Sequence, residues 1–180
     1  MKESLFLNTI QQILKMEQFE SAIESDTNTP PFGRVIVVLG NDHLERERIL
    51  EITTQTQDLG ESLKDPPEIP KYIRIQFEVP MPFDFKDHSA AEIASLIAFL
   101  NRMLELPGFE IDEVNSGIYY RYVLLTSDHR LDKDLITGII RVIIRLCEMF
   151  SDTIEQVSEG KCTFNDLVEH MLQSTEPLSE

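Results

Sequence analysis

The chain has 180 residues, of which 42% are hydrophobic, and its 32 acidic and 16 basic residues give a formal net charge of −16. This length and apolar content are enough for one domain with a substantial core. The acidic excess argues against a nucleic-acid or anionic-membrane partner, because such surfaces depend on basic patches.

No targeting or membrane-spanning segment is evident. The start, Met1 to Asn8, lacks an apolar stretch of signal-peptide length. No run approaches the roughly 18 apolar residues of a membrane span. Cys147 and Cys162 form no disulfide framework, which is typical of reduced thiols. We therefore expect a cytoplasmic protein that folds without a disulfide, a metal or a cofactor.

We predict one domain over 1–180, beginning with an N-terminal helical segment at 1–23. The helix itself is expected from residue 3, with an apolar stripe of Leu5, Phe6, Ile10, Ile13, Leu14 and Phe19. The polar, proline-ending run that follows favours a linker at 24–33.

Three strands are expected next. Residues 34–39 form a continuous apolar strand, and 40–42 have the composition of a turn. The charges of 45–57 are compatible with a helix, but its threonines and isoleucines favour a strand. After a proline-rich loop at 58–70, residues 72–79 alternate between apolar and polar side chains, which predicts one buried and one wet face.

The segment 80–85 is predicted to leave the sheet, because its two prolines remove ladder donors. Ser89 and Glu92 have the spacing of a capping box, which predicts a helix start there. That helix carries its apolar residues between Ile93 and Leu104 and ends before a Pro-Gly pair.

The second half is predicted to contain a hairpin and two helices. The hairpin joins 109–114 to 118–125, and the second of these strands is apolar on both faces, so we expect it inside the sheet. A long helix runs from Leu131 to Val157 and ends near Gly160. A short last helix and a fraying end make 163–180 a C-terminal cap and tail.

The predicted order is therefore α-β-β-β-α-β-β-α with an extra C-terminal helix. Strands that cluster rather than alternate with helices favour an α+β domain, an antiparallel sheet flanked by helices, over a doubly wound fold.

No catalytic or metal-binding motif is recognisable. Three Asp-His pairs, at 42–43, 87–88 and 128–129, could orient an imidazole for metal binding or base catalysis. All three lie at expected turns or helix starts, where Asp is also an ordinary turn or cap residue. We expect a non-enzymatic protein, with a small metal-dependent or ligand-binding enzyme using these pairs as the alternative.

The stronger signal is apolar. Met81, Phe83 and Phe85 alternate in a segment expected on the surface, which predicts a contact with a partner protein; the alternative is that they fold back over the core. The two main helices are apolar over more than one side. That width predicts a homodimer, with interface residues Ile97, Leu100, Ile140 and Ile144.

The order of elements resembles the type III secretion chaperone-like fold, and within it the YbjN-like group with its cyanobacterial relatives. The resemblance covers roughly 3–158 and rests on the strand 72–80, the helix 93–104 and the strand-turn-helix 119–148, which includes Tyr-Val-Leu-Leu at 122–125. It implies a small acidic homodimer that binds segments of other proteins.

Overall fold

The computed structural model describes residues 2–25, 33–58, 71–126 and 131–174. Four α-helices, one short 3-10 helix and six strands follow one another in these residues: α1 (Lys2–Met16), β1 (Ser21–Glu24), β2 (Arg34–Asn41), β3 (Glu47–Asp58), β4 (Lys71–Asp84), η1 (Asp87–Ser89), α2 (Ala90–Met103), β5 (Phe109–Asp112), β6 (Gly117–Thr126), α3 (Lys133–Ser158) and α4 (Phe164–Ser174).

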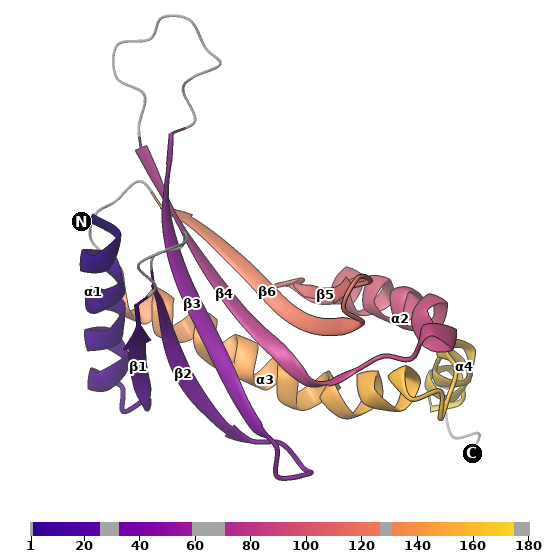
Figure 1. Ribbon diagram of the computed structural model, residues 1–180. Helices are drawn as coiled ribbons and strands as arrows, with labels where there is room; N and C mark the ends of the chain where they lie inside the picture. Colours follow the sequence, from indigo (N-terminus) through magenta and orange to yellow (C-terminus); the bar gives the residue numbers. More distant parts are fainter. Residues whose placement is uncertain (1, 26–32, 59–70, 127–130, 175–180) are drawn as a thin grey trace, which may run out of the picture.

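The strands form one antiparallel sheet in the order β1-β2-β3-β4-β6-β5, which confirms the predicted α+β class. In Figure 1, α3 runs across one side of the curved sheet, with α1 beside β1 and with α2 and α4 near the end that carries β5. Contacts of α1 with β1, β2 and β3, and of α3 with β4, place these helices against the sheet.

The core lies between the helices and one face of the sheet. The predicted alternation of β4 is confirmed, since Ile73, Ile75, Phe77 and Val79 are all at most 3% exposed while the side chains between them are partly exposed. The other face is polar at its centre. There Arg34 Nη1 donates to Glu51 Oε2 at 2.7 Å, and Arg121 pairs with Glu110.

The N-terminal helix is shorter than predicted, because α1 ends at Met16. Gln18 has a left-handed backbone with φ of 64°, which breaks the helix before the chain turns. Residues 21–23, expected to be helical, and Glu24, expected in the linker, instead form β1 and pair with β2, with Ile23 opposite Val35. Most of the predicted linker, 26–32, lies outside the described residues.

The prediction that the two prolines end the sheet before residue 80 is wrong, because β4 continues to Asp84. Its ladder with β3 ends at Glu78, whereas its ladder with β6 continues to Pro80 and, after an irregularity, to Asp84. The prolines therefore lie where β4 has a hydrogen-bonded neighbour on one side, which a strand with a missing donor tolerates.

The predicted capping box at Ser89 does not form. Ser89 has φ of −97° and ψ of −3°, outside the extended conformation that directs a cap side chain to the helix amides. Its Oγ has no hydrogen-bond partner among the residues that the structure describes. Glu92 Oε2 instead accepts the backbone N–H of Phe164 at 2.8 Å, which ties α2 to α4. A reciprocal cap does form between Thr163 and Asp166, at the start of α4.

The long helix confirms its prediction at both ends. Asp132 caps α3 by accepting the N–H groups of Asp134 and Leu135, and Gly160 takes the left-handed position after the helix with φ of 74°. Cys147 is buried in this helix, where burial raises the pKa of its thiol to about 12, and Cys162 is also a free thiol. Among the described residues no helix is long and apolar enough to cross a membrane.

Candidate functional surfaces

The first candidate surface is an open edge of β6. On one side β6 pairs with β4 as far as Thr126 opposite Ile73. On the other side β5 covers β6 only from Gly117 to Tyr120, after which Arg121 N–H donates to Gly108 O at 2.7 Å. Beyond that contact no described strand pairs with this side of β6. The prediction that 118–125 lies wholly inside the sheet therefore holds only for its first half.

The direction of the backbone groups along this edge follows from Arg121. Its N–H donates toward Gly108, and its carbonyl oxygen lies so close to Gly108 that an added Cβ there would be only 2.5 Å away. Backbone groups alternate in direction along a strand. Val123 and Leu125 therefore direct their N–H and C=O groups to the open edge, while Tyr122 and Leu124 direct theirs to β4.

The side chains along the edge are uncharged. Leu125 is 52% exposed and Val123 is partly exposed, and both lie on the sheet face away from the helices. Soluble proteins usually protect such an edge with Lys, Pro or a bulge. Residues 122–126 contain neither Lys nor Pro, so the edge is suited to adding another extended segment.

The residues predicted to bind a partner lie mainly in the core. Met81 is 7% exposed and Phe85 6%, so the expectation that they stand on the surface is wrong for these two. Ser151 Oγ donates to Met81 Sδ at 3.6 Å, and Phe83 is partly buried with Arg46 Cζ 5.5 Å from its ring centroid. Met81 and Phe85 continue the two-residue alternation of the buried β4 side chains from Ile73 to Val79, so they fall on the core face of the strand.

The residues predicted to form a dimer are used within the chain. Ile97, Leu100 and Ile140 are at most 6% exposed, and Ile144 packs against the core. The surplus apolar width of α2 and α3 arises because these helices pack against each other as well as against the sheet. The apolar residues of α3 that do remain exposed are Leu135, Val142 and Met149.

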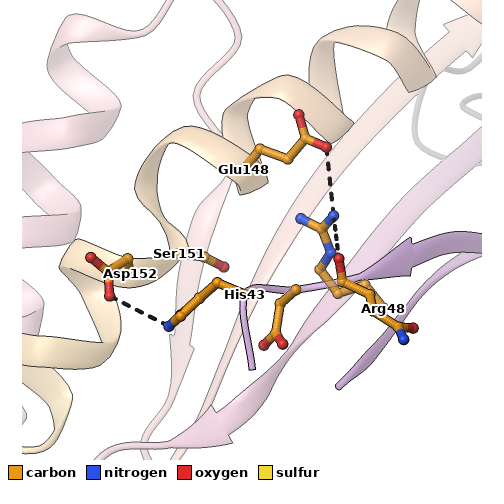
Figure 2. A pocket seen from close by; sticks show the side chains of 7 residues that line it. His43, Arg48, Glu148, Ser151 and Asp152 are labelled. Atoms are coloured by element: carbon orange, nitrogen blue, oxygen red, sulfur yellow. Dashed lines mark hydrogen bonds and ion pairs between the residues drawn. The ribbon is translucent and has the colours of Figure 1, made fainter. Parts of the chain in front are cut away.

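The second candidate surface is a pocket of about 450 Å³ between the β2–β3 hairpin and the last turns of α3. It is lined by Asn41, Asp42, His43, Arg48, Glu148, Ser151 and Asp152. Figure 2 shows His43 directed to Asp152 and Arg48 directed to Glu148 across this hollow.

Asp42 builds the hairpin that forms one wall. Its Oδ1 accepts the N–H groups of Leu44 and Arg46, both at 2.9 Å, and its Oδ2 accepts Arg46 Nε at 2.7 Å. Burial acts to raise the pKa of the Asp42 carboxyl, but the hydrogen bonds from Arg46 and Leu44 outweigh it and lower that pKa. This carboxylate is therefore fully engaged in the turn, where Glu45 has φ of 62°.

Arg46 fixes the hairpin to α3. Its Nη1 and Nη2 donate to Glu155 Oε1 and Oε2, both at 2.7 Å, in the paired geometry that suits a guanidinium and a carboxylate. The Glu155 side chain is only 11% exposed. These hydrogen bonds raise the pKa of the Arg46 guanidinium above its usual range, and they outweigh burial, which acts to lower it.

Arg48 has no comparable set of partners. The residue is 6% exposed, yet its Nε has no hydrogen-bond partner within the described chain. Its Nη2 lies 3.4 Å from Asn41 O and 3.6 Å from Glu148 Oε1, both long contacts. A cationic, incompletely paired side chain thus lines the pocket.

The Asp-His pairs do not come together as one site. His43 lines the pocket with its Nε2 3.7 Å from Asp152 Oδ1, whereas His88 lies against Gly160. The third pair, 128–129, lies outside the described residues. Within the described part of the chain, no three His, Cys, Asp or Glu side chains are grouped as a metal would require.

Sequence reasoning did not find Arg46, Arg48 or Glu155. Arg46 and Glu155 are 109 positions apart, so no local pattern connects them. The one available signal was the turn: Asp42 followed by charged residues between two apolar strands is compatible with a side-chain-built hairpin.

The geometry defines an α+β domain with an open strand edge and a polar pocket, and with no evident catalytic constellation among the residues described. Residues 72–156, from β4 to near the end of α3, match the model of the YbjN family, "Putative bacterial sensory transduction regulator". The resemblance to the YbjN-like group is thus confirmed for these residues. A comparison with curated proteins gives no significant match.

Proposed function

We propose that the protein is a non-enzymatic regulatory adaptor that binds an extended segment of another polypeptide along the open edge of β6. The single observation that carries the proposal is the alternation beyond Arg121, which directs the backbone groups of Val123 and Leu125 away from β4 and toward the open edge. An added strand would hydrogen-bond to these groups, and alternate side chains would lie beside Leu125 on the outer face.

The charge of the chain indicates the composition of the partner segment. A net charge of −16 favours association with a basic polypeptide and disfavours an acidic one. The segment should also favour the extended conformation, so β-branched and aromatic residues are expected in it and proline is not.

A peptide array tests this proposal. Random peptides probed with the wild-type chain should select basic, β-prone sequences without proline. Val123→Pro removes the N–H group that Val123 directs to the open edge of β6, and it leaves the ladder with β4 intact. This variant should therefore no longer select such peptides. Val123→Thr is the matched control, because it keeps the N–H group and the branched side chain, and it should select the same peptides. Equal selection by the Val123→Pro variant would contradict the proposal.

A homodimer is part of the proposal. Its support is a row of exposed residues on α3, Leu135, Val142 and Met149, which are 48%, 40% and 54% exposed and seven positions apart. Gly138 lies in the same row, and an added Cβ there would meet no atom of the described residues within 4 Å. A helix-interior glycine costs about 1 kcal/mol relative to alanine. Close approach by α3 of a second copy would give this glycine a packing role.

The chaperone-like likeness and a cytoplasmic location belong to the same proposal. They are supported by the order of elements, by the acidic charge and by the capacity of one sheet edge for a partner segment. A contact of Met81, Phe83 and Phe85 with a partner also stays a proposal. Of these three side chains Phe83 keeps the most exposed area, so it would make that contact.

A further inference from the structure

The pocket beside the β2–β3 hairpin contains a buried cation, Arg48, whose hydrogen-bonding capacity is only partly used by the described residues. Arg46 and Arg48 are two positions apart. Arg46 makes three hydrogen bonds of 2.7 Å to carboxylates, whereas Arg48 makes none shorter than 3.4 Å to the described residues. Buried polar groups are nearly always paired, and an unpaired charged donor is costly. Arg48 Nε is such a donor.

A carboxylate ligand would complete the hydrogen bonding of the Arg48 guanidinium. A guanidinium binds a carboxylate through two parallel N–H groups, which would satisfy Nε and one terminal nitrogen together. Glu148 does not occupy that position, since its nearest oxygen is 3.6 Å from Nη2 and its side chain is 57% exposed. It is free to turn outward when another carboxylate enters.

The remaining charges of the pocket restrict the ligand further. Asp42 shares the charge of Arg46 with Glu155, and Arg48 and His43 face two exposed carboxylates, Glu148 and Asp152. The Asp152 side chain is 62% exposed and also accepts a hydrogen bond from Gln156. With neutral His43 the lining residues have a net charge of −2 (Arg48 +1; Asp42, Glu148 and Asp152 −1 each), which disfavours a simple anion.

We infer that this pocket binds a small zwitterion of the amino-acid type, whose carboxylate pairs with Arg48 and whose ammonium group faces Glu148 and Asp152. Each charge of such a ligand then meets the opposite charge in the pocket: its carboxylate meets the buried arginine, and its ammonium group meets the exposed carboxylates. The volume of about 450 Å³ is in the range of small-molecule sites. Asn41 and Ser151 are the uncharged polar residues that line the pocket. Figure 2 shows Ser151 at its wall on α3.

The inference does not depend on the proposed polypeptide binding, because the pocket and the β6 edge are built from different residues. A ligand here would bridge the hairpin and α3, the two elements already joined by Arg46 and Glu155.

Nuclear magnetic resonance of the full-length, ¹⁵N-labelled chain tests the inference. Each standard amino acid is titrated to about 10 mM, which detects millimolar affinity, with acetate and methylamine as single-charge probes. At least one amino acid should shift the amides of Asn41, His43 and Ser151 saturably, and more tightly than acetate does. No saturable shift with any amino acid, or equal binding of acetate, would overturn the inference.

Variants test which pocket residues bind the carboxylate and the ammonium group of the ligand. Arg48→Gln should weaken amino-acid binding at least about tenfold, while Arg145→Gln, the same change at an exposed position of α3, should leave it unchanged. Because Arg48→Gln also changes a buried residue, Asp152→Asn provides a second test on the exposed side. This variant should bind the amino acid more weakly and acetate more tightly than the wild-type chain does. If Asp152→Asn changes neither affinity, or if Arg48→Gln folds and still binds normally, the assignment is wrong.

Discussion

Arg46 on the β2–β3 hairpin and Glu155 on α3 form a paired, largely buried ion pair with two hydrogen bonds of 2.7 Å. This contact joins a hairpin in the first third of the chain to the end of the longest helix. The pocket lies between the same two elements, although neither Arg46 nor Glu155 lines it.

Removing one charge of this pair should destabilise the fold. Glu155→Gln leaves the Arg46 guanidinium without its main partner, and we expect a loss of about 2–3 kcal/mol in the free energy of unfolding. Replacing both residues with methionine should cost less than the single change, because no unpaired charge remains. Arg34→Gln, which breaks exposed pairs, should cost no more than about 1 kcal/mol. Urea titration measures all three, and equal losses would contradict the buried role of the pair.

Asp42 predicts acid sensitivity of the hairpin. Its pKa is lowered in the folded state, so its contribution to stability is present above the unfolded-state pKa near 3.8 and is lost as pH falls through the folded-state pKa. Asp42→Asn keeps an oxygen acceptor for the turn but does not titrate. The fall in urea midpoint between about pH 5 and pH 2 should therefore be smaller in Asp42→Asn than in wild type. Identical pH profiles would show that Asp42 is not a source of the acid sensitivity.

Gly108 should not tolerate a side chain. An added Cβ would lie 2.5 Å from Arg121 O and 2.9 Å from Tyr120 Cζ, and backbone oxygen does not move aside as a flexible side chain does. Gly108→Ala should lower the free energy of unfolding by about 1–3 kcal/mol. A melting temperature equal to wild type would mean that the approach of Gly108 to β6 is looser than the structure shows.

The extent of successful prediction differs between local and non-local features. The alternation of β4, the hairpin of β5 and β6 and the two ends of α3 follow from local sequence signals, and all three were predicted. β1 was missed because its four residues form a strand only in pairing with β2. The prolines of β4 were misinterpreted because the sequence does not show that β3 leaves the ladder at Glu78.

The candidate surfaces were less predictable than the fold. Met81 and Phe85 continue the alternation of the buried residues from Ile73 to Val79, but this continuation was missed because the two prolines indicated that the strand ends before them. The open edge was partly foreseeable, because the first strand of the predicted hairpin was shorter than the second. Which backbone groups of β6 face this open edge depends on the hydrogen bond between Gly108 and Arg121, and local sequence patterns do not reveal that contact.

The proposed dimer predicts opposite effects of one substitution on two properties. Gly138→Ala should raise the free energy of unfolding of the isolated subunit by about 1 kcal/mol through helix propensity, yet weaken association by blocking close helix approach. Val142→Glu should give a monomer in sedimentation equilibrium, whereas Lys15→Glu, an exposed change on α1, should leave the dimer intact. A wild-type chain that sediments as a monomer at micromolar concentration would contradict the dimer itself.

Amide hydrogen exchange along β6 tests the proposed polypeptide binding most directly. In the free chain the amides of Val123 and Leu125 should exchange rapidly, while those of Tyr122 and Leu124, bonded to β4, should be protected. Saturation with a peptide selected on the array should slow exchange at Val123 and Leu125 by at least about tenfold and change Tyr122 and Leu124 little. If the peptide binds and the amides of Val123 and Leu125 still exchange at the free rate, strand addition at this edge is wrong.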